Sequence, residues 1–487
     1  MTRTSLLVWV TGLAIGTCAC ATSPETQIVN DAAAALGGRD RVLAVKTLLI
    51  DGEGTNWNVG QDMTPEATSQ AFIITGYRRA IDLTAGRGRI EQTRTPNFLY
   101  FQGQQPQKQV LGLDREIAYN VAPNGNVTRA SDAVAKNRRI DLYHHPLTIV
   151  RAALNSMAKL SNARATGSQR VVDVTDANGT VFTLAIDATT RLPTRVVSMI
   201  DNPNLGDLAL ETAFADYQDV NGLKLPSRLT TMADRYRTEE IRITKQIVDA
   251  DVGDLGAPPA AVLTPPITGP PPATVTVEEI AAGVWLLAGQ SHHSVLVEFG
   301  DHLTLIEAPQ SDTRTLAVIA RARQIRPDKP LTVVVNTHHH FDHSGGIRAA
   351  VASDLAVITH KANGPFVQDL VGRAHTIAPD ALAKNPKPLK FETVDDAREL
   401  KDSTRTVVLY PITGSPHADT LLMAYFPKER ILVEADVYSP GAAVHPFSAN
   451  LVENIRSRKL AVDRIVPIHG TVVSFGELLK TQLKATN

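Results

Sequence analysis

Four histidines and one aspartate lie within six residues in the second half of the chain. The sequence His-His-His-Phe-Asp-His occupies residues 338–343 and follows a short β-branched run at residues 331–335. Valine and threonine suit a pleated sheet, so this run predicts a buried strand. Gly345 and Gly346 are expected to let the chain turn sharply directly afterwards. The pattern therefore predicts a cluster of imidazole and carboxylate groups where a strand ends, a common position for functional residues.

Such a cluster is difficult to accommodate without a metal ion. Protonated histidines would repel one another, and buried neutral histidines would each need a partner. Imidazole and carboxylate groups are ligands that suit Zn²⁺ and similar divalent ions. In an extended segment His338 and His340 point to one side and His339 to the other, whereas Asp342 and His343 lie beyond the turn and can serve a second, adjacent metal. A solvated polar loop is the alternative, but the His-x-His-x-Asp-His spacing favours the metal site.

The size and composition of the chain predict a globular protein of two or three domains. Its 487 residues exceed what one hydrophobic core supports, and 43% are hydrophobic while 20% are charged. The 49 basic and 50 acidic residues leave a net charge of -1. Because no basic excess is available to neutralise phosphates, nucleic-acid binding is not expected, and we expect a small-molecule substrate instead. The oligomeric state stays open.

Residues 1–21 have the composition of a signal peptide. Arg3 supplies a positive start, and the apolar run at residues 6–15 is too short to span a bilayer. A small-residue pattern predicts cleavage after Ala21, so we expect a periplasmic or secreted protein without a transmembrane segment after cleavage. An N-terminal membrane anchor is the alternative that this short run disfavours.

Both cysteines of the chain, Cys18 and Cys20, fall inside this segment. Lipid attachment to one of them is possible in principle, but Thr-Cys-Ala before Cys20 is a poor match to a lipoprotein signal. After cleavage the chain would contain no cysteine, so neither a disulfide nor a thiolate ligand is expected.

Residues 22–255 predict a separate, largely antiparallel β-rich domain of unknown role. A first helix is expected at residues 25–36, and a second around residues 146–160. The adjacent pair His144 and His145 has no neighbouring carboxylate and is interpreted as surface or packing. The predicted strands are residues 47–52, 71–83, 109–121, 170–175, 180–187, 194–200, 208–217 and 241–248. A proline-rich stretch at residues 256–274 follows and is interpreted as an extended, semi-rigid linker.

Residues 275–487 alternate between strand and helix patterns, which predicts an α/β layered domain with its site at strand ends. Strands are expected at residues 284–287, 294–299, 303–307 and 355–359, and helices at 311–323 and 347–352. Three further candidate ligands, His417, Asp436 and His469, each come just after an apolar run. Singly, each has an ordinary structural explanation as a satisfied histidine or a turn-capping aspartate. Together with the histidine motif they form a complete constellation for two metals.

In the order and spacing of these residues, the segment 275–487 resembles the metallo-β-lactamase superfamily. The resemblance implies an αββα sandwich with two Zn²⁺ ions, or other divalent metals, at one edge. Where the family usually has an aspartate, this chain has Glu307, which is expected to alter how the histidines are oriented. The resemblance implies that His338, His340 and His417 hold the first metal, that Asp342, His343 and His469 hold the second, and that Asp436 bridges them. His292, His293 and Tyr438 are possible substrate contacts. The first domain is loosely similar to the half-barrels of periplasmic lipoprotein-carrier proteins, which implies a concave sheet.

These expectations favour an exported binuclear zinc-dependent hydrolase. A metal-bound hydroxide would attack an ester, lactone or related bond, with the catalytic Asp342 orienting it. A cysteine near Asp436, typical of thiolate-containing β-lactamases, is absent from the sequence. A metallo-β-lactamase or a phosphodiesterase on the same fold remains an alternative. An alternative of a different class is a periplasmic lipid- or ligand-binding protein with a structural metal domain.

Overall fold

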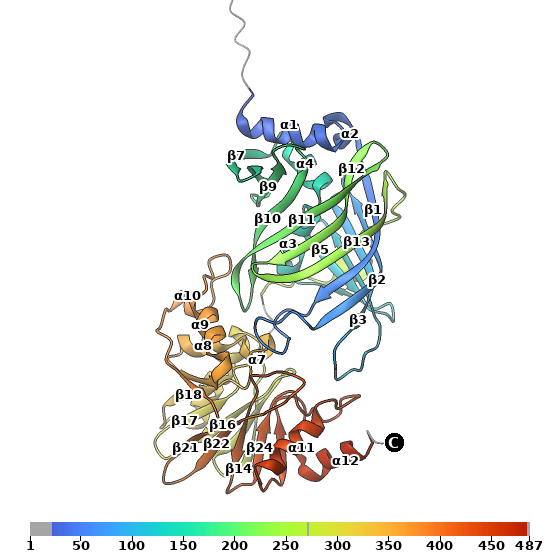
Figure 1. The fold of residues 1–487 in the computed structure, drawn as a ribbon. Helices are drawn as coiled ribbons and strands as arrows, with labels where there is room; N and C mark the ends of the chain where they lie inside the picture. Colours follow the sequence, from blue (N-terminus) through green and yellow to red (C-terminus); the bar gives the residue numbers. More distant parts are fainter. Residues whose placement is uncertain (1–21, 270–271, 485–487) are drawn as a thin grey trace, which may run out of the picture.

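The computed structural model describes residues 22–269 and 272–484 (Figure 1). The predicted signal peptide, its cleavage site and both cysteines lie outside the described residues. A large antiparallel sheet comes first along the chain, and a two-sheet sandwich follows it. No helix among the described residues is long and apolar enough to cross a membrane.

The first sheet has thirteen strands, in the spatial order β6-β5-β4-β3-β2-β1-β13-β12-β11-β10-β9-β8-β7. Neighbouring strands pair antiparallel throughout, for example β1 with β2 and β13. The strands are β1 (Thr47–Trp57), β2 (Ala71–Asp82), β3 (Arg87–Pro96), β4 (Gln107–Asp114), β5 (Ile117–Val121), β6 (Val127–Arg129), β7 (Lys159–Thr166), β8 (Gln169–Thr175), β9 (Val181–Asp187), β10 (Pro193–Asn202), β11 (Gly206–Val220), β12 (Leu223–Ala233) and β13 (Tyr236–Val248). The β-rich character predicted for this part of the chain is confirmed.

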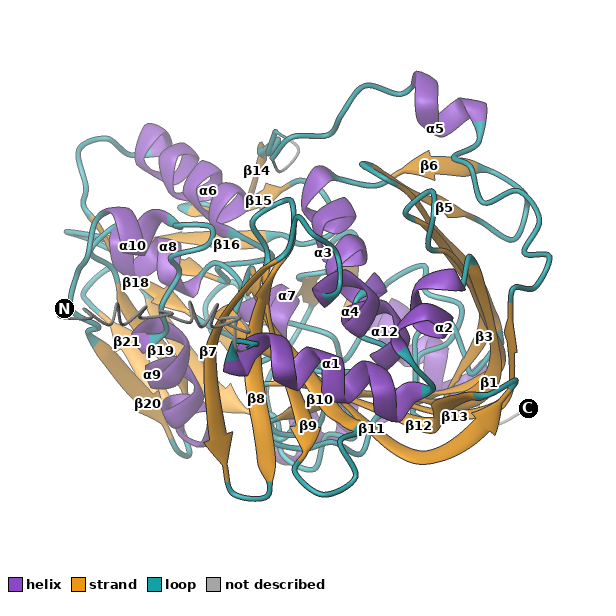
Figure 2. Cartoon of the chain, turned by 90° about the horizontal axis from the view of Figure 1, so that it is seen from above, coloured by secondary structure: helices purple, strands orange, loops and turns teal. Residues whose placement is uncertain are grey.

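The sheet curves around two helices, α3 (Asp132–Leu142) and α4 (Pro146–Ala153), as Figure 2 shows. Helix α4 contributes Leu147, Ile149 and Val150 to the core, and all three are fully buried. The expected concave surface is therefore filled by the helices of the same chain. His144 is also buried here, with Nδ1 2.9 Å from Thr212 Oγ1 and Nε2 2.9 Å from Ser198 Oγ.

Helices α1 (Pro24–Leu36) and α2 (Arg39–Ala44) cover one end of the sheet. The Oγ of Ser23 accepts a hydrogen bond from Thr26 N and caps the start of α1, with proline at the first helical position. Gly37 ends the helix with φ 127°, and a Cβ at this position would stand 2.3 Å from the carbonyl oxygen of Gly222. Glycine is therefore required both for the backbone angle and for the close approach of the neighbouring turn.

The second part of the chain is a four-layer αββα sandwich. Its first sheet has the order β14-β15-β16-β17-β18-β19-β20, and its second β21-β22-β23-β24-β25-β26. One apolar cluster lies between the sheets, a second packs the first sheet against its helices, and a third packs the second sheet against α11 and α12. The predicted fold class is confirmed.

The elements of the sandwich follow in chain order. The strands are β14 (Thr276–Ala281), β15 (Val284–Ala288), β16 (Ser294–Glu298), β17 (Leu303–Ile306), β18 (Leu331–Val335), β19 (Ala356–His360), β20 (Phe391–Val394), β21 (Arg398–Lys401), β22 (Thr406–Pro411), β23 (Leu422–Phe426), β24 (Ile431–Glu434), β25 (Arg464–Pro467) and β26 (Val473–Ser474). The helices are α6 (Asp312–Ile325), α7 (Phe341–Ser344), α8 (Ile347–Ala352), η1 (Lys361–Asn363), α9 (Gly364–Gly372), α10 (Ala381–Lys384), α11 (Ser448–Ser457) and α12 (Phe475–Lys484).

The proline-rich stretch contains one short helix, α5 (Pro259–Leu263), in place of a wholly extended chain. Ala261 of this helix is fully buried. Arg129 of β6 donates a hydrogen bond of 2.7 Å to the carbonyl oxygen of Thr264, which fastens the stretch to the edge of the first sheet.

The connection between β1 and β2, residues 58–70, joins the first sheet to the sandwich. We name it the β1–β2 loop, and Figure 1 shows it reaching toward α7. The carbonyl oxygen of Gly60 accepts a hydrogen bond of 3.0 Å from Phe341 N, and Met63 O accepts one of 2.9 Å from Asp419 N. A Cβ at Gly60 would lie 2.4 Å from ring atoms of Phe341, so only glycine permits this contact.

Candidate metal centre

The histidine motif begins three residues after the end of β18. His338 and His340 lie in the loop, and the short helix α7 then carries Asp342 and His343. This is the strand-end position that the sequence predicts. The β-strands of the sandwich thus hold the start of the motif at a fixed place.

The two glycines after the motif serve close packing. Gly345 and Gly346 have φ values of -63° and -104°, which other residues also adopt. A Cβ at Gly345 would stand 2.3 Å from Gln310 O, and one at Gly346 would stand 1.8 Å from Thr315 Oγ1. The sequence predicts glycine here for a sharp turn. The structure shows instead that glycine is required because a Cβ would collide with neighbouring atoms beside α6.

The other candidate residues come from further strand ends. His292 lies between β15 and β16, His417 between β22 and β23, Asp436 just after β24, and His469 just after β25. Their side chains and those of the motif form two groups. Group one contains His338, His340, His417 and Asp436, and group two contains His292, Asp342, His343 and His469. In each group one ligating atom per residue lies within 4.8 Å of all the others.

Asp436 is near both groups. Its Oδ2 lies 3.2 Å from His417 Nε2 in group one and 3.1 Å from His343 Nε2 in group two. Its Oδ1 lies 2.8 Å from His469 Nε2. This position matches what a bridging carboxylate needs. The structure therefore brings all seven sequence-predicted ligands together at one edge, while their role as ligands stays a prediction.

Three imidazole nitrogens of group one are buried and make no hydrogen bond within the described chain. They are Nε2 of His338, Nδ1 of His340 and Nε2 of His417. A buried polar atom without a hydrogen bond is costly, and although Asp436 lies close to His417, a cation would satisfy all three nitrogens at once. The donor set of imidazole and carboxylate fits Zn²⁺.

The second ring nitrogens of His338 and His340 are held by neighbours. Thr337 Oγ1 donates to Glu307 Oε2 and lies 3.1 Å from His338 Nδ1, so it accepts the proton of that ring. His340 Nε2 donates a hydrogen bond of 2.8 Å to the carbonyl oxygen of Asp62. Both bonds fix the tautomer that leaves the unpaired nitrogen free for a metal.

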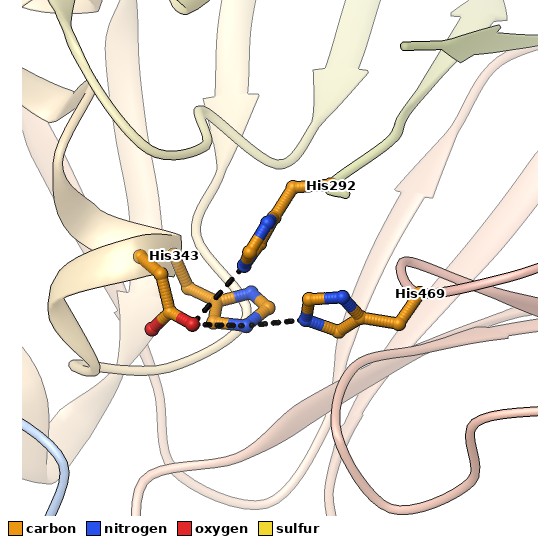
Figure 3. Close-up of side chains that lie close together, drawn as sticks. His292, His343 and His469 are labelled. Carbon is orange, nitrogen blue, oxygen red and sulfur yellow. Dashed lines mark hydrogen bonds and ion pairs between the residues drawn. The ribbon is translucent and has the colours of Figure 1, made fainter. Parts of the chain in front are cut away.

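Group two follows the same plan, and Figure 3 shows the rings of His292, His343 and His469 lying close together. His343 Nδ1 donates to Glu307 Oε2 at 3.0 Å, and His469 Nδ1 donates to the carbonyl oxygen of Ser291 at 2.8 Å. His292 Nδ1 lies 2.8 Å from Ser291 Oγ, while its Nε2 points to Asp342 Oδ2 at 3.1 Å. Each ring is thus oriented from outside with its second nitrogen toward the centre.

The β1–β2 loop supplies two of the outer contacts. Besides the Asp62 carbonyl, Gln61 Nε2 donates a hydrogen bond of 2.7 Å to Asp342 Oδ1. The loop itself is fixed by the buried Asp62 carboxylate, which accepts hydrogen bonds from Met63 N, Ser69 N, Ser69 Oγ and Gln70 N at 2.6 to 2.8 Å. One segment of the first domain therefore touches a member of each group.

The charges of the site favour a bound cation. Burial and the neighbouring His343 hold the pKa of His338 well below its usual value, and burial and His417 do the same for the pKa of His340, so both stay neutral as metal ligands must. Burial opposes it, but the carboxylates of Asp436 and Asp342 raise the pKa of His343 well above its usual value. The two carboxylates thus favour positive charge at the centre, which a bound cation would supply in place of the ring proton.

Two residues of the site have a left-handed backbone. Glu307 has φ 80° and Asp436 has φ 61°. Such angles are uncommon in residues with a Cβ and are concentrated at functional sites. Glu307 is fully buried, and this backbone aims its carboxylate at both Thr337 and His343.

A cavity of about 630 Å³ opens over the two groups. Asp342, His417, Asp436 and His469 line its floor. The first sheet and the sandwich both contribute walls, which consist of Asn58, Gln61, Gln70, Phe72, Arg94, Phe98, Leu99, Tyr100, Phe101, Ser291, Ser439, Pro440, Gly441, Ala442, Phe447 and Gly470. The site is therefore accessible to a small molecule and is formed by both parts of the chain.

The three predicted substrate contacts lie in different surroundings. His292 is a member of group two, so its position suits a ligand or an orienting group. His293 Nε2 donates to the carbonyl oxygen of Gly470 at 3.0 Å, and this residue is not part of the cavity wall. Tyr438 is buried with its ring 5.2 Å from that of His445, and the next residue, Ser439, lines the cavity instead.

The αββα sandwich and the two groups of histidine and aspartate at its edge define a fold and site compatible with a metal-dependent hydrolase. Residues 287–437 match the family model of the metallo-beta-lactamase superfamily. The C-terminal domain accordingly belongs to this superfamily, as the sequence predicts.

Several solved structures are similar to part of the chain. The metallo-beta-lactamase from Pontibacter korlensis is 18% identical, with a TM-score of 0.34, and the match covers 44% of this chain and 100% of that one. FIM-1 from Pseudomonas aeruginosa in its mono-zinc form is 18% identical, with a TM-score of 0.35 and coverage of 44% and 97%. The enzyme from Hirschia baltica is 16% identical, with a TM-score of 0.34 and coverage of 44% and 97%. No curated protein matches the chain significantly.

Proposed function

We propose that this protein is an exported hydrolase that uses two Zn²⁺ ions to cleave an ester or lactone bond. The observation that carries the proposal is the pair of four-residue groups that meet at Asp436 and open into one cavity. His338, His340 and His417 would hold one ion, Asp342, His343 and His469 the other, and Asp436 would bridge them. Bound metal would supply an activated water and polarise the substrate carbonyl.

The residues of the chain provide orientation and charge. Asp342 lines the cavity, and although burial opposes it, His343 and His292 hold the pKa of its carboxyl well below the usual range. Asp342 therefore remains an anion and can accept a hydrogen bond from the attacking water. Gln61 donates to its Oδ1, whereas Oδ2 lies on the side of His292.

A thiolate ligand is excluded by the sequence from residue 21 onward, because both cysteines precede it. This absence favours ester or lactone cleavage over the chemistry of thiolate-containing β-lactamases. The donor count also argues against a purely structural metal, since a closed structural site needs four ligands and eight side chains converge here. Export is supported by the apolar run and small-residue pattern of residues 1–21.

The decisive experiment compares His340→Ala with wild type on lactones, aryl esters, phosphodiesters and β-lactams, with and without chelator. We expect about two equivalents of bound metal in wild type, chelator-sensitive hydrolysis of an ester or lactone, and no hydrolysis by the variant. His302→Ala is the matched control, because this histidine stacks on Phe299 outside both groups. Wild-type rates in His340→Ala on every substrate that the parent cleaves would overturn the proposal. Preference for a β-lactam or a phosphodiester would select one of the alternatives.

A further inference from the structure

One arginine in the cavity wall has unused hydrogen-bonding capacity. Arg94 of β3 is half-buried, and its Nε donates a hydrogen bond of 2.8 Å to Gln107 Oε1. Its guanidinium carbon lies 4.1 Å from the ring centroid of Phe72. Within residues 22–269 and 272–484, Arg94 forms no ion pair with a carboxylate, and its two terminal nitrogens make no hydrogen bond. The guanidinium of Arg94 is thus held in place beside the cavity, while its terminal N–H groups stay available as hydrogen-bond donors.

An aromatic wall connects this arginine with the candidate metal centre. The β3–β4 loop, residues 97–106, carries Phe98, Tyr100 and Phe101, which all line the cavity. The ring of Phe98 lies 5.2 Å from that of Phe72 and 5.8 Å from that of Tyr100. The chain of rings therefore begins at the residue on which Arg94 stacks.

The other end of the wall reaches a predicted metal ligand. The ring of Phe101 lies 5.3 Å from that of Phe447 and 6.4 Å from that of His417. Val444 N donates a hydrogen bond of 3.1 Å to the carbonyl oxygen of Phe101, which ties the β3–β4 loop to the sandwich. The wall is thus anchored on both parts of the chain.

We propose that Arg94 and the aromatic wall form the substrate-binding subsite, and that the substrate is an ester or lactone with an apolar body that ends in a carboxylate. The proposal rests on the hydrolase function proposed above and adds the substrate class. The apolar body lies along Phe98, Tyr100 and Phe101, with the scissile carbonyl near His417 and Asp436. The carboxylate pairs with the terminal nitrogens of Arg94. Planar guanidinium and carboxylate groups can form two parallel N–H···O hydrogen bonds.

Charge complementarity supports this orientation. The carboxylates that line the cavity, Asp342 and Asp436, belong to the metal groups, and Arg94 is the one arginine among the residues of the wall described above. No lysine is present in that wall. An anionic substrate end placed at Arg94 is therefore kept away from the two aspartates, and the opposite orientation leaves the arginine unpaired.

The test uses two esters that differ only at the far end. One is the mono-4-nitrophenyl ester of adipic acid, and the other is the same ester with the far carboxylate converted to a primary amide. Arg94→Gln removes the charge, Arg94→Lys keeps it, and Arg228→Gln in β12 is the control because Arg228 pairs with Asp216 outside the cavity wall. We expect Arg94→Gln to raise KM about tenfold or more for the carboxylate ester, with kcat nearly unchanged. For the amide ester we expect Arg94→Gln to raise KM less than twofold. For the carboxylate ester, the KM of Arg94→Lys should lie between those of wild type and Arg94→Gln.

Equal effects of Arg94→Gln on both esters, or no effect on either, would overturn the subsite while leaving the hydrolase function intact. A direct binding measurement separates the two proposals further. Calorimetric titration with 4-phenylbutyrate requires no turnover, and we expect measurable binding to wild type that weakens about tenfold in Arg94→Gln. If wild type cleaves no ester but shows this difference, the proposed function and the ester substrate fail, while carboxylate binding by Arg94 stands. Equal affinity of the two proteins for 4-phenylbutyrate would again overturn the subsite.

Discussion

The Nε2 of His340 donates a hydrogen bond of 2.8 Å to the main-chain carbonyl of Asp62, although 278 residues separate them in the sequence. A predicted metal ligand of the sandwich is thereby oriented by a loop of the first sheet. Outer partners of this kind fix the tautomer and direction of metal-binding histidines, and their loss typically lowers metal affinity 10- to 100-fold. The β1–β2 loop is thus expected to affect metal retention without contributing a ligand itself.

Replacing Asp62 with alanine should weaken metal binding by group one. The Asp62 carboxylate holds the β1–β2 loop through four hydrogen bonds, so its removal loosens the carbonyl that orients His340. We expect about a tenfold or larger loss of metal affinity, measured by competition with a chromophoric chelator. Ser69→Ala removes one of the four bonds and should cost less. An unchanged affinity in Asp62→Ala would show that the loop does not position His340.

Gln61→Ala should weaken the second metal and leave the first nearly unaffected. Gln61 contacts Asp342 Oδ1 at 2.7 Å, and Asp342 belongs to group two. Cobalt substitution, followed by absorption spectroscopy during titration, resolves the two binding steps. We expect the weaker step to shift by about tenfold. Gln70→Ala is the matched control, because Gln70 lines the same cavity and its side chain has no hydrogen bond to Asp342 within the described residues.

Glu307→Gln should reduce metal affinity through two histidines at once. The Glu307 carboxylate accepts from His343 Nδ1 directly and from His338 through Thr337 Oγ1. A neutral amide loses the charge-assisted bond to His343, so metal content after dialysis against chelator should fall below that of wild type. Glu278→Gln on the exposed surface of β14 should retain the wild-type content. Full retention in both variants would contradict a role for Glu307 in holding these rings.

Two buried histidines of the first sheet should contribute less stability as the pH falls from about 6.5 to 4, a loss that Glu239 opposes because burial raises the pKa of its carboxyl to about 7. Burial, assisted by Arg79, lowers the pKa of His144 to about 4 and that of His145 to about 3, against about 6.5 in an unfolded chain. In this range the unfolded chain binds protons that the folded chain excludes. The stability that these two histidines contribute is therefore fully present above pH 6.5 and falls with decreasing pH, by up to about 1.4 kcal/mol per unit for each histidine.

Urea unfolding of a Trp285→Phe variant at several pH values measures this effect, because Trp57 is then the remaining tryptophan from residue 22 onward. Adding His144→Gln should reduce the slope of the free energy of unfolding against pH by the contribution of one titrating histidine. Since this substitution also removes the bonds to Ser198 and Thr212, the slopes are compared and not the absolute stabilities. If the slope is identical with and without His144→Gln in the Trp285→Phe variant, His144 does not contribute to the pH dependence of stability.

The sequence allowed the sandwich and its seven predicted ligands to be located, because each ligand follows a short apolar run that forms a buried strand. Strands such as β18 are rich in β-branched residues, and their ends lie together at one edge of the fold. His292 was predicted as a possible substrate contact, and its place among the side chains of group two was not predicted. The Ser-His-His-Ser segment has no distinctive spacing, and only the folded arrangement brings its first histidine to Asp342.

The first sheet was harder to predict strand by strand. β3 contains Arg87, Arg89, Glu91 and Arg94, so its charged composition conceals a strand that forms because β2 and β4 offer ladder partners on both sides. Helix α3 was missed for a similar reason, since it buries only Ala135 and Ile140. Contacts of the β1–β2 loop with the metal motif have no local signature, because they depend on the folding of two parts far apart in sequence.

The β1–β2 loop is the connection between two strands whose pairing extends from Thr47 with Asp82 to Trp57 with Ala71. Its ends cannot shift without sliding or bending that ladder. If a substitution deep in the first sheet distorts this strand pair, the distortion would consequently reach the imidazole of His340. Remote changes that nowhere touch the cavity are therefore the ones to screen for altered metal retention.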